Sequence, residues 1–318
     1  MSTIESASQV EAPRKSYGWR LKILLGLNFL ALGVFIFSRL SPSQVERLGP
    51  LAESLHAALN PSEKAWKFGP AGRRLMADVR KLGGQATRTG RTPGFLGLFG
   101  TEHFYVDVYG EEFGDGDLAR LIEKHGDRIT GLDLRQTKVT DAGLRHLQGM
   151  PLLEDLVLGN ADMSRVPRRQ DRMPTSPITD AGLAHLRDLK KLQNLTLEGL
   201  PITDAGLAAM DDLPGLSGFN LVRTQVKGPG LARFKSLSRL VGLSLEGSRV
   251  NDEGLAHLAG ATKVQWLRLN GLPLTADGLE VLKSMPGLVH LDITGCGFLD
   301  EEVAKFEASQ PGLTVEHR

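Results

Sequence analysis

A 24-residue period runs through the C-terminal part of this 318-residue chain and constrains its fold more than any other feature. Each copy starts with an apolar residue, and the clearest copy extends from Leu192 to Gly215. The copies start at Ile129, Leu153, Leu192, Leu216, Leu240, Val264 and Leu288. The 39 residues between Leu153 and Leu192 equal one period of 24 plus an insertion of 15, at 161–175. A fixed period of this length predicts a solenoid, in which each repeat contacts only its neighbours.

Each copy has the pattern of one strand followed by one helix. In the clearest copy, Leu192, Leu195 and Leu197 follow the spacing L-x-x-L-x-L, and the last two alternate as in a short strand with one buried face. Thr203 is suited to cap a helix N-terminus, and Asp204 follows in the first turn, where negative charge is favoured. Gly206 allows the helix to approach the core, and Pro214 ends the helix. Since no repeat buries both elements alone, stacked copies predict an α/β solenoid with a parallel sheet on its concave face and helices on its convex face.

This pattern resembles the short leucine-rich repeats with an I-T-D-x-G-L core, which occur in F-box-associated repeat proteins and in large families of bacterial membrane-anchored proteins. The resemblance covers about Phe104 to Arg318 and implies a leucine-rich-repeat fold with a binding role. It leaves the partner open, because members of the family bind many different molecules. The chain lacks an F-box-like N-terminal segment. It also departs from the repeat at Lys227–Gly230, where K-G-P-G replaces T-D-A-G and predicts a shorter helix.

An apolar segment near the N-terminus predicts a membrane anchor. Residues 23–38 are free of charge, and Leu21 and Leu40 extend the segment toward the length of about 20 residues that spans a bilayer. A cleaved signal peptide and a buried helix remain alternatives. Positive residues are more frequent before the segment than after it: Arg14, Lys15, Arg20 and Lys22 against Arg39 and Arg47. This bias predicts a cytoplasmic N-terminus and a repeat domain in the periplasm or outside the cell.

The predicted organisation is a series of segments that leads to the repeats. The segments are a cytoplasmic tail at 1–20, a transmembrane anchor at 21–40, a stalk at 41–69, an N-terminal cap with a degenerate repeat at 70–128, and the repeats at 129–318. Within the cap, apolar residues on one face predict a helix over 70–82. The apolar, Gly-rich residues 93–100 are expected to cover the exposed end of the solenoid core.

Composition and motifs argue against several classes of function. A net charge of +1 gives no reason to expect a nucleic-acid partner. The single cysteine, Cys296, excludes an internal disulfide and a multi-cysteine zinc site. We find no P-loop, dinucleotide or hydrolase motif, so we expect no enzyme, no cofactor and no metal. Cys296 occupies a repeat position that favours a packed thiol over a nucleophile, and Asp115 and Asp117 are better explained as a helix start than as calcium ligands.

The first candidate binding site lies at the C-terminal end of the concave face. The strand positions that project from this face are mostly small and polar, but four residues in neighbouring repeats differ: Trp266, Arg268, His290 and Asp292. Residues 24 apart should lie side by side, so these four are expected to cluster. Exposed Trp and Arg are frequent in binding hot spots. The alternative is an ordinary surface with one partly buried tryptophan.

The second candidate is the insertion, which leaves the solenoid just after a strand. Its arginines are Arg165, Arg168, Arg169 and Arg172. A long loop in a repeat fold is often functional, and this one would suit an acidic partner or a lipid headgroup. The alternative is a tolerated, solvated loop.

Together these features predict a membrane-anchored binding module that presents its concave face to a still unknown protein or glycan outside the cytoplasm. Two alternatives remain open. In the first, the chain is a structural spacer or envelope component without a discrete ligand. In the second, it is a hydrolase that uses His290 with Asp292.

Overall fold

The computed structural model of the chain describes residues 69–91, 101–108, 112–159, 178–235 and 237–317. Nearly all of them belong to one compact unit, formed by residues 73–93 and 100–318. Within the described residues, no helix combines the length and the apolar character needed to cross a membrane. The predicted anchor at 21–40, the apolar segment at 93–100 and the insertion at 161–175 lie outside the described residues.

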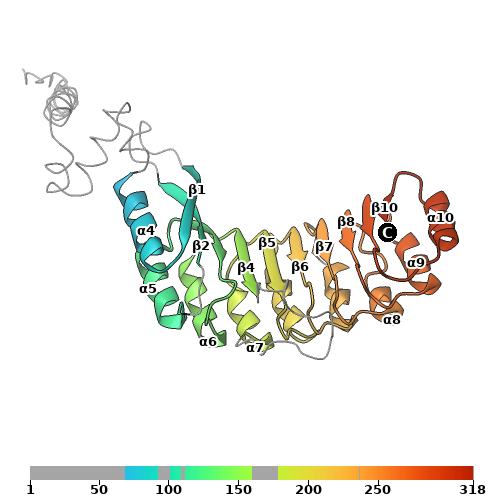
Figure 1. Cartoon of the computed structure of the whole chain (residues 1–318), viewed down its shortest axis with the longest axis horizontal. Helices are drawn as coiled ribbons and strands as arrows, with labels where there is room; N and C mark the ends of the chain where they lie inside the picture. Colours follow the sequence, from blue (N-terminus) through green and yellow to red (C-terminus); the bar gives the residue numbers. More distant parts are fainter. Residues whose placement is uncertain (1–68, 92–100, 109–111, 160–177, 236, 318) are drawn as a thin grey trace, which may run out of the picture. The chain divides into compact units, whose positions relative to one another are not determined.

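The strands of the repeat unit form one sheet, ten-stranded in the part of the chain that the structure describes, and their order in space follows the sequence. The strands are β1 (Gln85–Arg91), β2 (Glu102–Asp107), β3 (Ile129–Asp133), β4 (Asp155–Gly159), β5 (Asn194–Glu198), β6 (Gly218–Asn220), β7 (Gly242–Ser244), β8 (Trp266–Arg268), β9 (His290–Asp292) and β10 (Thr314–Glu316). All neighbours from β2 to β10 are parallel. Figure 1 shows the strands along the inner face of a curved row, with the helices along the opposite face. The predicted leucine-rich-repeat solenoid is therefore confirmed.

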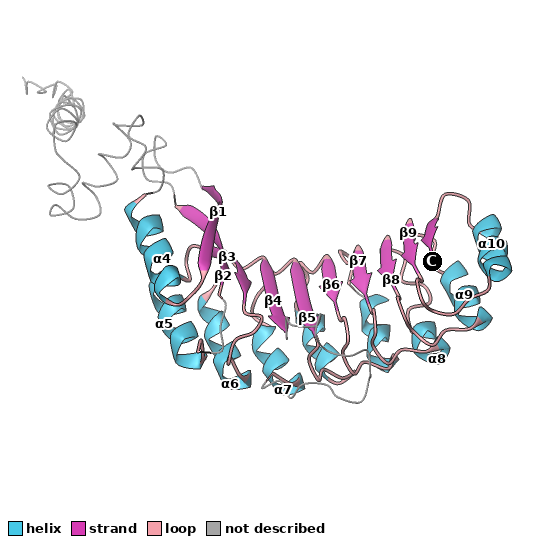
Figure 2. Ribbon diagram, in the orientation of Figure 1, coloured by secondary structure: helices cyan, strands magenta, loops and turns pink. Residues whose placement is uncertain are grey.

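The helical side consists of short segments, many of them 3₁₀ turns (Figure 2). The α-helices are α4 (Pro70–Lys81), α5 (Asp115–His125), α6 (Asp141–Leu144), α7 (Asp180–Leu183), α8 (Asp252–Ala256), α9 (Ala276–Lys283) and α10 (Asp300–Ser309). The 3₁₀ segments are η3 (Arg145–Gly149), η4 (Ala184–Leu186), η5 (Gly206–Asp212) and η6 (Pro229–Lys235). A 3₁₀ turn rises about 2.0 Å per residue, so it spans the repeat with fewer residues than an α-helix. The prediction of a shorter helix after Lys227 was wrong in length, because η6 has seven residues, as many as η5.

The core lies between the sheet and the helical segments. In the repeat that starts at Leu192, the side chains that face inward are at most 1% exposed: Leu195, Leu197, Ile202, Leu207 and Met210. Full burial of each such side chain stabilises the fold by roughly 1.5–3 kcal/mol before the cost of chain ordering. The same positions recur in every repeat, so the core is continuous along the solenoid.

The N-terminal end is closed by a helix and an antiparallel strand. The predicted helix is confirmed as α4, whose Leu75 and Val79 are fully buried and which Gly83 ends with a φ of 80°. β1 pairs antiparallel with β2 and covers the edge of the parallel sheet. The sequence did not predict β1, because Gln-Ala-Thr-Arg-Thr-Gly-Arg has no alternation of apolar and polar residues.

Neighbouring repeats are joined on the helical side by what we call the aspartate ladder. In each step, an Asp at the start of one helical segment accepts hydrogen bonds from the backbone N–H and the hydroxyl of the Thr that precedes the next repeat's helical segment. The steps join Asp115 to Thr140, Asp141 to Thr179, Asp180 to Thr203 and Asp252 to Thr275. For Asp180 the distances to the Thr203 nitrogen and hydroxyl are 2.9 and 2.5 Å. The helix glycine predicted to approach the core in fact makes room for this carboxylate, because a Cβ on Gly206 would overlap Asp180 Oδ1.

Candidate functional site: the exposed face of the sheet

The exposed sheet face presents three rows of side chains that run across the strands. The first row includes Gly218, Gly242, Trp266, His290 and Thr314, which are successive register partners. The second row includes Thr196, Asn220, Ser244, Arg268 and Asp292. The third row, one repeat apart in the same way, includes Glu198, Val222, Glu246, Asn270 and Thr294. A period of 24 residues in register makes each row a straight line of neighbours.

The structure brings together the four residues predicted at the C-terminal end of this face. Trp266 pairs with His290 and Arg268 pairs with Asp292 in the register of β8 and β9. The Trp266 and His290 rings are stacked, with centroids 3.7 Å apart and planes inclined by 17°. Trp266 nevertheless keeps 52% of its surface exposed. We call these four residues the Trp266 cluster; that they bind a partner stays a prediction.

Asp292 is an ionised, hydrogen-bonded member of the Trp266 cluster. Burial opposes its ionisation, but hydrogen bonds from Asn270 and Thr294 and the charge of Arg268 outweigh burial and lower its pKa. One of these bonds joins the Thr294 backbone nitrogen to Asp292 Oδ1 at 3.1 Å. Asp292 thus orients Thr294 and Asn270, whereas His290 packs on Trp266. A catalytic histidine needs a group that orients it, and these contacts give no support to the hydrolase alternative.

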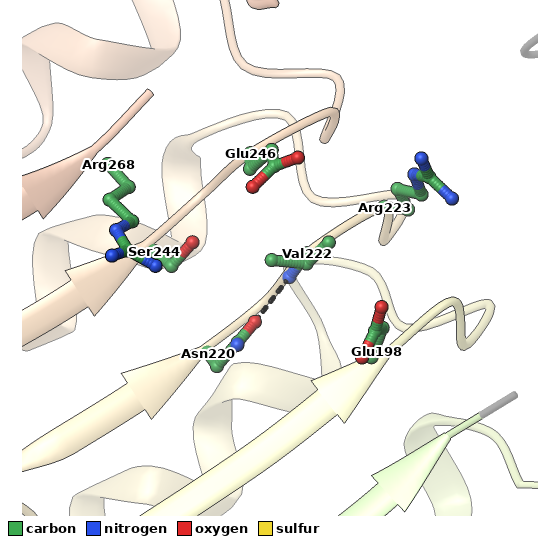
Figure 3. Close-up of a pocket in the computed structure, with 7 residues that line it drawn as sticks. All are labelled: Glu198, Asn220, Val222, Arg223, Ser244, Glu246 and Arg268. Carbon is green, nitrogen blue, oxygen red and sulfur yellow. Dashed lines mark hydrogen bonds between the residues drawn. The ribbon is translucent and has the colours of Figure 1, made fainter. Parts of the chain in front are cut away.

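An open pocket of about 410 Å³ lies beside the cluster, along the second and third rows. Figure 3 shows the residues that line it: Glu198, Asn220, Val222, Arg223, Ser244, Glu246 and Arg268. Arg268 belongs to both the pocket and the Trp266 cluster, so the two features form one continuous surface. Of the pocket residues, only Arg268 was among the predicted site residues.

Arg223 occupies a backbone conformation that four of the described repeats give to glycine, and Gln136 is the other non-glycine residue at this position. The residue after the strand has a positive φ in successive repeats: 67° at Gly199, 54° at Arg223, 61° at Gly247, 69° at Gly271 and 72° at Gly295. A residue with a Cβ is disfavoured there by roughly 1–2 kcal/mol. Gly247 leaves space for the arginine, because a Cβ there would lie 3.1 Å from Arg223 Cγ. A non-glycine residue at this repeat position is no sufficient sequence signal for the pocket, because Gln136 shares it and does not line the pocket.

Two polar atoms on this face are buried without a hydrogen-bond partner among the described residues: Ser244 Oγ and Asn270 Oδ1. Asn220 differs, because its Oδ1 accepts a hydrogen bond from the Val222 backbone nitrogen at 2.9 Å (Figure 3). Buried polar groups are normally paired, and an unpaired one destabilises the fold. Ser244 lines the pocket, but its Oγ is enclosed by protein atoms and is not exposed to the open space.

The remaining candidates have structural roles or lie outside the described residues. Cys296 is 8% exposed, its Sγ lies 3.1 Å from the Leu269 carbonyl oxygen, and burial raises its pKa, so the predicted packed thiol is confirmed. Asp115 starts α5 and joins the aspartate ladder, and Asp117 accepts from the Gly114 backbone nitrogen at 3.2 Å, as expected for a helix start. Within the described residues no His, Cys, Asp and Glu side chains group in a way that suits a metal ion. The four insertion arginines are not among the described residues.

No family model and no curated protein matches this chain. Among solved structures it is similar to internalin C2 from Listeria monocytogenes, with 20% sequence identity and a TM-score of 0.45 over 70% of this chain and 81% of that one. It is also similar to the mouse RP105/MD-1 complex, with 19% identity and a TM-score of 0.43 over 67% of this chain and 34% of that one. Independently of these weak similarities, the 24-residue period and the parallel sheet with helices on its opposite face show that this chain has the leucine-rich-repeat architecture.

Proposed function

We propose that this chain is a binding module whose ligand site is the exposed sheet face, where the Trp266 cluster and the pocket meet. The observation that supports this most directly is the half-exposed Trp266, held in a stack on His290. Tryptophan is enriched in binding hot spots. Its rigid support on a strand lowers the entropy lost on binding.

The full proposal includes a location. A single helix at 21–40 anchors the chain, with the N-terminus in the cytoplasm and the repeats in the periplasm or outside the cell. The uncharged segment and the positive charges that precede it support this topology. Labelling of intact cells with a membrane-impermeant thiol reagent tests it, with a new cysteine at the exposed Glu301 in a Cys296→Ser background. Labelling only after the cells are broken open would contradict an outward-facing repeat domain.

The partner is a protein or a glycan, and the insertion arginines form a second contact with acidic groups of a partner or with lipid headgroups. This part of the proposal rests on their charge and on their position in the sequence, directly after a strand. The competing function, a spacer without a ligand, predicts that substitutions on the sheet face have no effect on function. The two proposals are therefore separated by the same set of variants.

In-cell photo-crosslinking tests the binding module. A photoreactive aromatic amino acid at position 266 keeps a ring on His290, and a second probe at position 169 tests the insertion. The matched control is a probe at the exposed Glu280, on the helical side of the same region. We expect a discrete product from position 266, none from position 280, and loss of the partner in the folded Trp266→Ala, Arg268→Ala double variant. Equal products from positions 266 and 280, or a partner that the double variant retains, would reject the site.

A further inference from the structure

The exposed ring of Trp266 has one covered face and one face toward an adjacent strand. His290 on β9 stacks against one side of the ring, with planes only 17° apart. The two stacked residues lie on neighbouring strands, so the line that joins their rings runs from β9 to β8. Each ring plane is therefore roughly perpendicular to that line. The second face of Trp266 is therefore directed toward β7, where its register partner is Gly242.

Gly242 leaves an open slot in front of this second face. A Cβ on Gly242 would have no heavy atom within 4 Å, so the space above its backbone is empty. One strand farther, Asn194 covers Gly218, since a Cβ there would lie 2.5 Å from Asn194 Oδ1. The slot is thus bounded by Trp266 on one side and Asn194 on the other. Two strand spacings of about 4.8 Å separate β6 from β8, which gives room for one ring between the two walls.

The polar groups beside the slot offer both donors and acceptors without a net charge. Ser244 lies two residues along the same strand as Gly242, and its hydroxyl oxygen has no partner among the described residues. Arg268 lies opposite Ser244 on β8. The pocket that they line contains two guanidinium groups, from Arg223 and Arg268, and two carboxylates, from Glu198 and Glu246. These charges balance, so the site favours neither a strongly anionic nor a strongly cationic ligand.

We infer that the slot and the pocket together bind a neutral saccharide. One sugar ring places its apolar C–H face on the free face of Trp266 above Gly242, and its hydroxyls reach Arg268. The next sugar units occupy the pocket, where the guanidinium and carboxylate groups donate and accept hydrogen bonds from hydroxyls. A site with one flat aromatic surface and several polar groups of both kinds fits a polyhydroxylated ring better than it fits a single peptide side chain. This inference rests on the proposed function and specifies its ligand.

Titration calorimetry with neutral oligosaccharides tests the inference. The full chain is used in a polyoxyethylene detergent, whose headgroup contains no sugar, and the probes are tetrasaccharides of glucose, N-acetylglucosamine, mannose and xylose. The decisive variant is Gly242→Leu, which fills the slot and leaves Trp266 and every pocket residue in place. Gly242 has no positive φ and its Cβ direction is open, so this substitution is compatible with the fold. The matched control is Thr314→Leu, which places a leucine in the same row on the far side of His290.

We expect at least one probe to bind, Gly242→Leu to weaken its affinity by roughly tenfold or more, and Thr314→Leu to leave it unchanged. Trp266→Ala should abolish binding, because it removes the stacking surface. The inference is overturned if no probe binds, or if the folded Gly242→Leu variant binds as tightly as the parent chain. A protein that crosslinks to position 266 in the absence of saccharide binding would overturn the ligand class and leave the binding module intact.

Discussion

The two surfaces of the solenoid use the same 24-residue period in opposite ways. On the helical side, the aspartate ladder repeats the same residue types, and each Asp accepts hydrogen bonds from the Thr that precedes the next repeat's helical segment. On the sheet side, the second row changes from Thr196 through Asn220 and Ser244 to Arg268. Positions that join adjacent repeats keep one side chain, because each must fit the same neighbour. Positions that face solvent vary freely, so a ligand site forms where the residue type changes along a row.

The ladder is interrupted at Gly228, in one of the repeats that also contribute residues to the pocket. Gly228 occupies the ladder position after Lys227, so the next N-cap, Asn251, has no Asp partner from that repeat. There the backbones pack directly, because a Cβ on Gly254 would overlap the Lys227 carbonyl oxygen and lie close to Gly228. The repeats involved contribute β6 and β7, the strands of Asn220 and Ser244. The break in the ladder on the helical side and the pocket residues Asn220 and Ser244 on the sheet side thus belong to the same pair of repeats.

The largest expected effect is on folding and concerns Gly254. Gly254→Ala places a methyl group against the backbone of Lys227, which has no side-chain freedom to yield. We expect it to lower the free energy of unfolding by about 3 kcal/mol or more, measured by urea denaturation. Gly242→Ala on the sheet side is the matched control, and its open Cβ position predicts no loss or a gain of about 0.5 kcal/mol. Equal losses from both substitutions would contradict the distinction between the two surfaces.

Removal of Asp204, which holds the same position in its repeat as the ladder aspartates Asp141, Asp180 and Asp252, should have the next largest effect. Asp204 accepts from three backbone nitrogens, those of Lys227 and Gly228 at 3.0 Å and that of Gly230 at 2.8 Å. Asp204→Ala leaves these donors without a protein acceptor and should cost about 2–3 kcal/mol of stability. The control is Asp277→Ala, at an exposed first-turn Asp outside the ladder, which should cost at most about 0.5 kcal/mol. Similar midpoints for both variants in thermal unfolding would show that the ladder adds little beyond helix capping.

Arg223 allows stability and binding to be changed in opposite directions. Arg223→Gly relieves an unfavourable φ of 54° and should raise stability by up to about 1 kcal/mol. It also removes a pocket guanidinium and should weaken ligand binding. Gln136→Gly is the matched control, because Gln136 has a φ of 60° and does not line the pocket. Calorimetry of both variants should show the stability gain in each and the loss of binding only in Arg223→Gly.

The smallest expected effect is a pH dependence at the opposite end of the sheet. Burial, followed by the nearby charge of Asp133, raises the pKa of Asp107 above its ordinary value of 3.8. A raised folded-state pKa stabilises the protein at low pH, and this contribution is lost as pH rises through that value. Asp107→Asn should therefore raise the melting temperature slightly at neutral pH, with the difference vanishing below pH 3.8. A difference that persists in acid would indicate a steric cause.

The sequence by itself determined the repeat and everything that follows from its period. The interval of 24 residues placed Trp266 beside His290 and Arg268 beside Asp292, and the apolar positions identified the core. Cys296 could be assigned to the interior for the same reason, from its position within the repeat. These predictions need only the direction in which each side chain points. In a solenoid, the pattern of apolar and polar residues within one repeat sets that direction.

Only the tertiary structure decided how side chains of adjacent repeats meet. The Asp180 to Thr203 bonds, the free face of Trp266 above Gly242 and the approach of Arg223 to Gly247 each join residues from two repeats. The sequence of one repeat identifies Asp180 only as a residue at the start of a helix and Gly242 only as a small residue in a strand. Their roles depend on rotamers and on space left by a neighbour about 4.8 Å away, which a one-dimensional pattern does not contain.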